Sequence, residues 1–275
     1  MGIVAFMKFV QQPMQQEISG PPPHSSDLTS LAIEVIGREG SIALLSGTSV
    51  IAARTLTRDS RAASSLAPTI ADFAAEYLPG GTLDSLGSIA VASGPGSFTG
   101  LRIAVTTAKT LAYALDTPLI AVNSLVAIAD VAAQKSNPAD RDLTLPAPLS
   151  RSILVGLSAY RGQVYRGKFT PGQPPSIDIV SAAQWKAELQ LSARANGDVG
   201  LTDDKNKFLF AGDQSVFSPA GAAIDPDQWS GEDEVRAIGV GRVAAEMLAR
   251  GETIDPLKLV PDYLRPSSAE EKVGP

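Results

Sequence analysis

The sequence has no cysteine among its 275 residues, and it has a single histidine. The absence of cysteine excludes disulfides, zinc–thiolate sites, iron–sulfur clusters and thiol nucleophiles. The one histidine, His24, follows three consecutive prolines near the start of the chain. A histidine in such a segment is more typical of a solvated loop than of a metal ligand or a general base. We therefore expect no metal site and no histidine-dependent catalysis.

Long apolar runs and an excess of positive charge are also lacking. No run reaches the about 18 apolar residues that a membrane-spanning helix needs. The opening residues 1–10 are apolar, but they lack the basic start and the cleavage site of a signal peptide. The net charge of -6 predicts no basic surface large enough to neutralise many phosphates. We expect a cytoplasmic protein without membrane contact that meets nucleic acid only through a partner.

What the sequence does contain is an alternation of strand and helix patterns. Residues 1–27 are rich in Gln and Pro and predict a flexible tail that is dispensable for folding. After it come β-rich runs with Gly turns, followed by segments in which apolar residues recur at helical spacing. This order predicts an α/β fold, with three strands over 28–56, a helix over 60–78, a strand over 88–93, a helix over 99–115 and a strand over 118–122.

A second, similar unit follows a break in the pattern. Residues 132–150 are rich in Pro, Asp and Ser and predict a linker. Beyond it, ILVGLSAYRGQVYRGKF can be laid on LAIEVIGREGSIALLSG with a constant offset of 122, which matches Gly162 to Gly40 and Val155 to Ile33. We therefore expect a duplicated fold, with domains over 28–121 and 122–275 and a C-terminal helix over 234–250 that packs back on the first domain.

Three glycines lie between the strand over 88–93 and the following helix. The spacing is not that of a Walker A motif, because no lysine follows Gly100. It is close to a dinucleotide fingerprint, but the next strand ends in Asn123 and Ser124 instead of an acidic residue. Two interpretations remain: a tight turn that orients the helix, and an anion site at the helix N-terminus. The pattern favours the tight turn. The loop consists of Gly94, Pro95, Gly96, Ser97, Phe98, Thr99 and Gly100.

Both predicted helices carry a second face of small residues beside an apolar core stripe. The core stripes are Leu66, Ile70, Phe73 and Tyr77 in the first helix, and Leu101, Ala104, Val105, Ala108, Leu111, Ala112 and Leu115 in the second. Small residues let another helix approach closely, although alanine also serves helix propensity alone. We predict a helix-packed partner interface made of Ala63, Ala67, Ala71, Ala74, Arg102, Ile103, Thr106, Thr107, Thr110 and Ala114.

Carboxylates elsewhere do not form a catalytic or metal-binding pattern. Asp203, Asp204 and the acidic run 232–234 lie in predicted loops and are expected to be solvated. Lys109 lies on the same side of its helix as Arg102 and is expected to be a surface or interface charge.

The segment SGPGSFTGLRIAVTTAKTLAYALDTPLIAVNSL, residues 93–125, closely resembles the signature region of the TsaB (YeaZ) family. The hairpin ILVGLSAYRGQVYRG, the AGD at 211–213 and the PDYLR at 261–265 are similar to that family as well. The resemblance implies two related actin-like, sugar-kinase-like (ASKHA) domains, each a mixed sheet with helices. It implies a non-catalytic scaffold that pairs with TsaD, the paralogue with the metal and nucleotide site, and with TsaE.

The same resemblance implies the reaction and the surfaces involved. The complex would transfer threonylcarbamoyl to adenosine 37 of tRNAs that read ANN codons, with tRNA contacted only through the complex. The implied partner surface is the helix pair over 60–78 and 99–115, which a homodimer of this chain could also use. No cofactor is expected in the isolated chain, and a nucleotide would lie at the interface with TsaD.

One departure from the family concerns the end of the first strand. The family has Asp-Thr-Ser there, and this chain has Glu34, Val35 and Ile36. A nucleotide site of this fold needs an Asp-x-Gly-Thr turn whose amides and hydroxyl meet phosphate and metal. We therefore expect no ATP hydrolysis by the isolated chain. The alternative is a small-molecule kinase or nucleotide hydrolase of the same fold, which the glycine loop and the α/β order would support.

Overall fold

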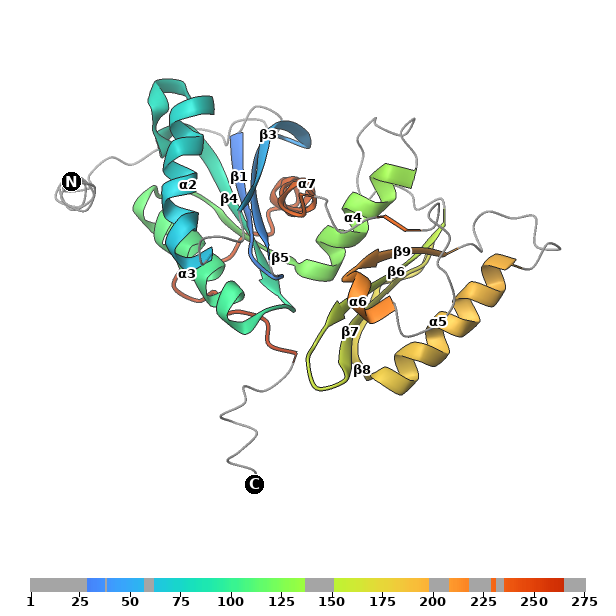
Figure 1. Cartoon of the computed structure of the whole chain (residues 1–275). Helices are drawn as coiled ribbons and strands as arrows, with labels where there is room; N and C mark the ends of the chain where they lie inside the picture. Colours follow the sequence, from blue (N-terminus) through green and yellow to red (C-terminus); the bar gives the residue numbers. More distant parts are fainter. Residues whose placement is uncertain are drawn as a thin grey trace.

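The computed structural model describes residues 29–37, 39–56, 62–136, 151–197, 208–217, 229–230 and 235–264. The predicted tail over 1–27, with His24, lies outside the described residues, as do Asp203, Asp204 and the acidic run 232–234. Two sheets stand apart with two helices between them, and further helices cover the outer faces (Figure 1). The chain is therefore an α/β protein with two mixed sheets.

The first sheet has five strands in the order β3-β2-β1-β4-β5. The first three strands form an antiparallel meander, and the glycine loop's strand joins β1 in parallel. Gly47, with a φ of 56°, forms the tight turn between β2 and β3. The bounds agree with the predicted elements: β1 Thr29–Glu34, β2 Gly40–Ser46, β3 Ser49–Leu56, α2 Ala62–Tyr77, β4 Leu86–Gly94, α3 Phe98–Ala114 and β5 Leu119–Asn123, with short 3-10 turns at Pro79–Gly81 and Leu83–Ser85.

Helices α2 and α3 cover the outer face of this sheet and enclose the first outer cluster. Its largest members include Leu31, Ile33, Leu66, Phe73 and Leu119. The predicted core stripes hold with one correction, Tyr77, which is 41% exposed. Tyr77 is the last residue of α2 and so lies at the end of the core stripe, with its ring edge to face with that of Phe73 at 5.0 Å between centroids.

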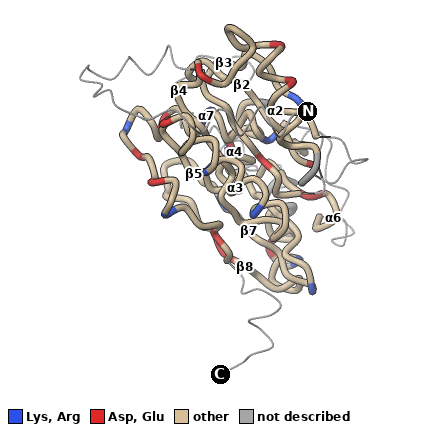
Figure 2. Tube along the Cα trace, turned by 90° about the vertical axis from the view of Figure 1, so that its left-hand side faces the viewer, with Lys and Arg blue, Asp and Glu red and all other residues tan. Residues whose placement is uncertain are grey.

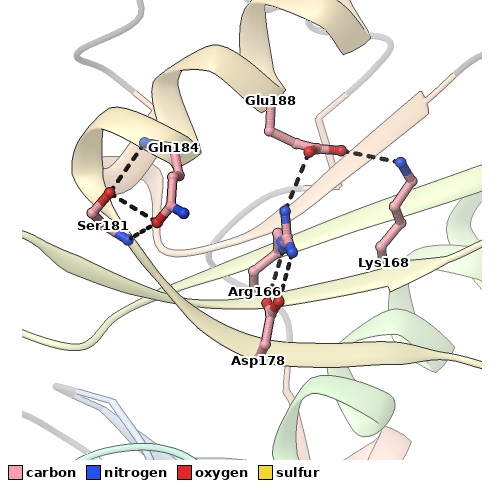
Figure 3. A network of polar contacts seen from close by, with 6 residues as sticks. All are labelled: Arg166, Lys168, Asp178, Ser181, Gln184 and Glu188. Carbon is pink, nitrogen blue, oxygen red and sulfur yellow. Dashed lines mark hydrogen bonds and ion pairs between the residues drawn. The ribbon is translucent and has the colours of Figure 1, made fainter.

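The second sheet has four strands in the order β8-β7-β6-β9, with α5 and α6 on its outer side. Aromatic rings fill the second outer cluster, in which Phe217 meets Trp185, Phe210 and Trp229 edge to face. Helix α5 begins with a capping box, since Ser181 and Gln184 bond each other's backbone amides (Figure 3). The bounds are β6 Ser152–Ser158, β7 Gln163–Phe169, β8 Ser176–Ser181, α5 Ala182–Gly197, β9 Phe208–Gly212 and α6 Gln214–Phe217.

Two helices, α4 (Ser124–Ser136) and α7 (Ala237–Ala249), lie between the sheets and pack on each other. Helix α4 follows the first sheet in the chain and packs on the second sheet. Helix α7 follows the second sheet in the chain and packs on the first sheet. A side chain at Gly239 would overlap the carbonyl oxygen of Ala127, and this glycine therefore sets the close approach of the two helices. Around them is the central cluster, which includes Leu125, Val155, Tyr165 and Val240.

Helix α4 corrects the predicted linker. Residues 132–136 form its last turn, and Ala132 is fully buried. The polar residues of this turn are typical of a loop and led to the linker prediction. Leu125, Ile128 and Ala132 nevertheless recur at helical spacing, which buries one face of the helix. Residues 137–150 of the predicted linker lie outside the described part of the chain.

The predicted repeat is present as two strand–turn–strand units, but its constant offset is wrong for the first strand. Ile33 lies in the first outer cluster, whereas its predicted match, Val155, lies in the central cluster. Ile42 and its match, Val164, both lie in outer clusters. The connection spans 35–39 in the first hairpin and 159–162 in the second, one residue fewer. An odd change in register moves a strand's side chains to the opposite face, so no single offset fits both strands.

Candidate partner interface and signature loop

The glycine loop over 94–100, here called the signature loop, is a strand-to-helix turn between β4 and α3. Ser97 is the N-cap of α3, and its hydroxyl oxygen accepts a hydrogen bond from the amide of Gly100 at 3.4 Å. The amide of Ser97 itself donates to the carbonyl oxygen of Ile36 at 2.9 Å. Two donors that an anion would need at this helix N-terminus are thus bonded within the protein.

Glycines in the signature loop let the connection between β1 and β2 pack against it. A Cβ at Gly96 would lie 2.6 Å from the Cβ of Ile36, and one at Gly100 would overlap the carbonyl oxygen of Val35. Val35 and Ile36 therefore fill the space beside the loop, where a phosphate would lie if the turn held one. The residues that depart from the family pattern are thus part of the core at this point.

The C-terminal strap, residues 254–264, covers the other side of the signature loop. Gly94 has a φ of 132°, and a side chain there would overlap the backbone of Asp262. The amide of Asp262 donates to the carbonyl oxygen of Ser93 at 2.7 Å, and the ring of Tyr263 lies 4.9 Å from that of Phe98. The loop is therefore held between two segments far apart in the sequence.

The strap also follows α3 along one side. Ile254 forms a bridge with Leu119 at the edge of β5, and Leu259 is buried in the first outer cluster. Lys109 donates from Nζ to the carbonyl oxygen of Leu259 at 2.7 Å. The sequence predicted Lys109 as a surface or interface charge, but its partner lies within the chain.

Arg102, one of the predicted interface residues, is exposed and at the same time tied to the strap. Its Nε donates to the hydroxyl of Tyr263 at 3.1 Å, and its guanidinium lies 4.0 Å from the centroid of the Phe98 ring. This arrangement presents a flat charged group beside the start of α3.

Most other predicted interface residues are exposed on α2 and α3, the two helices on the side of the molecule that faces the viewer in Figure 2. Ile103 and Thr107 are partly buried on the flank of α3, and Ile103 packs against the first outer cluster. Ala63 lies in α2, but its side chain is outside the described part of the chain. The exposed residues, here called the α2/α3 face, are Ala67, Ala71, Arg102, Thr106, Thr110 and Ala114.

The prediction for Ala74 is wrong, because this residue is 3% exposed and belongs to the first outer cluster. Ala74 follows Ile70 by four residues, a spacing that places both on the same side of a helix. The predicted interface leaves out Tyr113, which is 69% exposed on α3. A large aromatic residue outside the core stripe of a helix is the signal that would have found it.

Glu34 is buried at the end of β1 with its carboxylate fully engaged. Oε1 accepts from the amide of Ile36 at 2.7 Å, and Oε2 accepts from the hydroxyl of Ser41 at 2.9 Å. Burial raises the pKa of Glu34, while the nearby positive charge of Arg236 acts to lower it. The amide of Ile36 and the hydroxyl of Ser41 are therefore bonded to Glu34 and are not free to bind a phosphate.

A second buried carboxyl group, Asp130, lies where α4 meets α7. Burial raises the pKa of Asp130 to about 7, against the lowering effect of Arg242 and with a smaller raising effect of Glu246. The guanidinium of Arg242 is 3.8 Å from Oδ2 of Asp130. Within the described ranges no group of three or more His, Asp or Glu side chains is placed to hold a metal ion. Nor does any helix there combine the length and the apolar character needed to cross a membrane.

Known proteins are similar to this chain in sequence. A family model described as "TsaD: tRNA N6-adenosine threonylcarbamoyltransferase" matches residues 57–217. A "tRNA threonylcarbamoyladenosine biosynthesis protein TsaB" of Bacillus subtilis (strain 168) is 33% identical over 193 residues, which cover 68% of this chain and 73% of the relative. A protein with the same description from Buchnera aphidicola subsp. Schizaphis graminum (strain Sg) is 33% identical over 88 residues, 32% of this chain and 36% of the relative.

Among solved structures, YeaZ from Pseudomonas aeruginosa is similar with a TM-score of 0.61 at 22% sequence identity. The likeness covers 86% of this chain and 99% of that protein. At this level of identity the match supports the fold alone, which is an α/β arrangement of two mixed sheets with helices.

Proposed function

The chain belongs to the TsaB (YeaZ) family, within the wider group that the TsaD threonylcarbamoyltransferase model describes, and from this premise we propose that it is a non-catalytic subunit of a complex. Its role is in tRNA threonylcarbamoyladenosine biosynthesis. It pairs with TsaD, and with TsaE, for threonylcarbamoyl transfer to adenosine 37 of tRNAs that read ANN codons. It acts in the cytoplasm and meets tRNA through the complex.

The observation that carries this proposal is the α2/α3 face. Two neighbouring helices present small side chains outward, among them Ala67, Ala71, Thr110 and Ala114, while their core residues lie on the opposite side. Small side chains permit interaxial distances at the short end of the usual range of about 8–10 Å. Such a face suits helices of a second protein, which in this proposal are those of TsaD or of another copy of the chain.

The surroundings of Glu34 support the non-catalytic part of the proposal. Phosphoryl transfer needs a cradle of free donors and a metal held by carboxylates. Here the amide of Ile36 and the hydroxyl of Ser41 are bonded to Glu34, and Ser97 caps its own helix. In this proposal the two sheets belong to actin-like domains over 28–121 and 122–275, and a nucleotide binds at the interface with TsaD, not in this chain.

A reconstituted reaction tests the proposed function. Purified chain, TsaD and TsaE from the same organism are mixed with unmodified tRNA and an activated threonylcarbamoyl donor, and the modified nucleoside is measured by mass spectrometry. We expect product only when this chain and TsaD are both present, and no Mg²⁺-dependent ATP turnover by this chain alone. Full activity of TsaD and TsaE without the chain, or turnover by the chain alone that Glu34→Ala abolishes, would overturn the proposal.

A further inference from the structure

A chain of polar contacts starts in the first sheet at Glu34. Ser41 donates to Glu34 and accepts, through the same hydroxyl, a hydrogen bond from the amide of Ala237 at 3.0 Å. Ala237 is the first residue of α7, so this contact ties the N-terminus of the central helix to the β1–β2 hairpin. Glu34 and Ser41 are both buried, and they therefore exchange no hydrogen bonds with bulk water.

The contacts continue into the second sheet through Arg236, the residue before α7. Its Nη2 donates to Oδ1 of Asp213 at 3.4 Å. Asp213 follows β9, and its other carboxylate oxygen accepts from the amide of Ser158, at the end of β6, at 2.9 Å. The amide of Asp213 donates to the carbonyl oxygen of Gly156 at 2.8 Å, which fixes the carboxylate relative to β6.

Arg236 thus pairs with Asp213 of the second sheet, while the next residue, Ala237, is tied to the first sheet through Ser41. The charge of Arg236 acts on Glu34, and Asp213 acts on Glu34 with the opposite sign. The Arg236 side chain is only 14% exposed, so solvent screens these interactions weakly. Without the guanidinium, Asp213 would lose its ion pair with the start of α7, and the charge that offsets the mutual effect of the two acids would be gone.

The remaining contacts across this region are largely apolar. Gly239 on Ala127 and Gly241 on Leu45 bring α7 close to α4 and to β2, and neither contact provides a directional hydrogen bond. Close-packed apolar helices can shift past one another by small sliding movements. The ion pair of Arg236 at the start of α7 would restrict such movement, as would the longer ion pair between Arg242 of α7 and Asp130 of α4.

We propose that Arg236 is a latch that holds the two sheets in one relative orientation, because its guanidinium binds Asp213 of the second sheet while the start of α7 beside it is tied through Ser41 to the first sheet. With the latch closed, the β1–β2 hairpin, the start of α7 and the ends of β6 and β9 move as one body. Loss of the guanidinium releases the sheets from this orientation while each keeps its own core. The inference goes beyond the proposed function and holds whether or not TsaD binds.

The absence of cysteine makes a distance measurement direct, because two introduced cysteines are the sole attachment points for spin labels. Tyr113 on α3 and Leu191 on α5 are 69% and 64% exposed and lie on the outer sides of the two sheets, so Tyr113→Cys and Leu191→Cys report the separation. Electron–electron resonance on the full chain then gives the distance distribution. We expect a narrow distribution in the otherwise unchanged protein, and a longer or broader one with Arg236→Gln.

A matched control is available inside the second sheet. Arg166 joins two acids, Asp178 at 2.6 Å and Glu188 at 3.2 Å, but both partners lie in the same half of the molecule (Figure 3). Arg166→Gln should therefore leave the distance distribution unchanged. Circular dichroism and the fluorescence of Trp185 and Trp229, both in the second outer cluster, check that each variant is folded.

Asp213→Asn provides a milder second variant in case Arg236→Gln does not fold. It removes one charge and keeps an oxygen that can accept from the amide of Ser158. It should move the distribution in the same direction as Arg236→Gln, and Arg236→Lys should restore part of the narrow distribution. A distribution that is identical in the unchanged protein and in folded Arg236→Gln or Asp213→Asn would overturn the latch.

Discussion

Gly100 allows α3 to begin directly against the backbone that connects β1 to β2. A Cβ at this position would overlap the carbonyl oxygen of Val35, which belongs to backbone that cannot turn away as a flexible side chain can. We predict that Gly100→Ala lowers the free energy of unfolding by about 1–3 kcal/mol or more, as overpacking of a rigid site does. Urea unfolding followed by circular dichroism measures the loss.

Gly37→Ala is the matched control for this prediction. Its nearest neighbours to an added Cβ are 3.4 and 3.5 Å away, which is ordinary van der Waals contact. Its unfolding free energy should change by less than about 0.5 kcal/mol. Equal effects of the two substitutions would contradict the close approach of the signature loop to Val35.

Asp130 makes the stability of the protein depend on pH around neutrality. Burial raises its pKa from 3.8 to about 7, so between these two pH values the folded state keeps a proton that the unfolded state has released. The stability that the neutral Asp130 side chain provides is complete below about pH 4, and it is lost as the pH rises through about 7. The shift corresponds to a loss on the order of 4 kcal/mol.

The variant Asp130→Asn should not show this loss, because its amide stays neutral. We predict that its unfolding free energy, relative to that of the unchanged protein, increases from pH 5 to pH 8.5. Asp84→Asn changes an exposed carboxylate and should show no such trend. The prediction is wrong if the unfolding free energies of Asp130→Asn and the unchanged protein differ by the same amount at pH 5 and at pH 8.5. Glu34 and Glu246 also have raised pKa values. Both residues are present in Asp130→Asn and in the unchanged protein, so the difference between these two proteins reports on Asp130.

At the scale of elements, the C-terminal strap is held to α3 by contacts between residues far apart in sequence. The bond from Lys109 to the carbonyl oxygen of Leu259 is charge-assisted and partly buried. We predict that Lys109→Met loosens the strap, so that the amides of Ile254 and Asp262, bonded to Leu119 and Ser93, exchange with deuterium faster. Hydrogen exchange with mass spectrometry measures this.

The matched control is Lys186→Met, which removes an exposed lysine from α5. Exchange in the strap should be the same as in the unchanged protein. Faster exchange of α3 itself in Lys109→Met, with no change in the strap, would show that the bond serves the helix and not the strap.

The strands and helices of the first sheet could be predicted from the sequence because their apolar spacing and Gly turns are local signals. The contacts that decide the site are not local. Ala74 was placed on the wrong side because an alanine carries little information about which side of a helix faces the core. The strap on α3 pairs residues some 150 positions apart, Lys109 with Leu259, and no periodicity within either segment indicates such a contact. The last turn of α4 was missed because its polar side chains resemble a linker.

At the scale of the whole molecule, the two sheets serve different surfaces. The first sheet supports the α2/α3 face and the signature loop, and the strap joins that loop to the end of the described chain. The second sheet has its own aromatic cluster and lies on the far side of α4 and α7 (Figure 1). A partner that binds the α2/α3 face therefore leaves the outer surface of the second sheet exposed. Substitutions on α5 should not affect such binding.

If TsaD binds the α2/α3 face as proposed, calorimetric titration of this chain with TsaD from the same organism will detect it. We expect saturable binding by the unchanged chain and by Leu191→Trp on α5. We expect no binding by the Thr110→Trp, Ala114→Trp double variant, whose large side chains would block close helix approach while the core of α3 stays intact. Circular dichroism checks the folding of each variant. Binding of a folded double variant with unchanged affinity, or no binding by the unchanged chain, would show that TsaD does not bind this face.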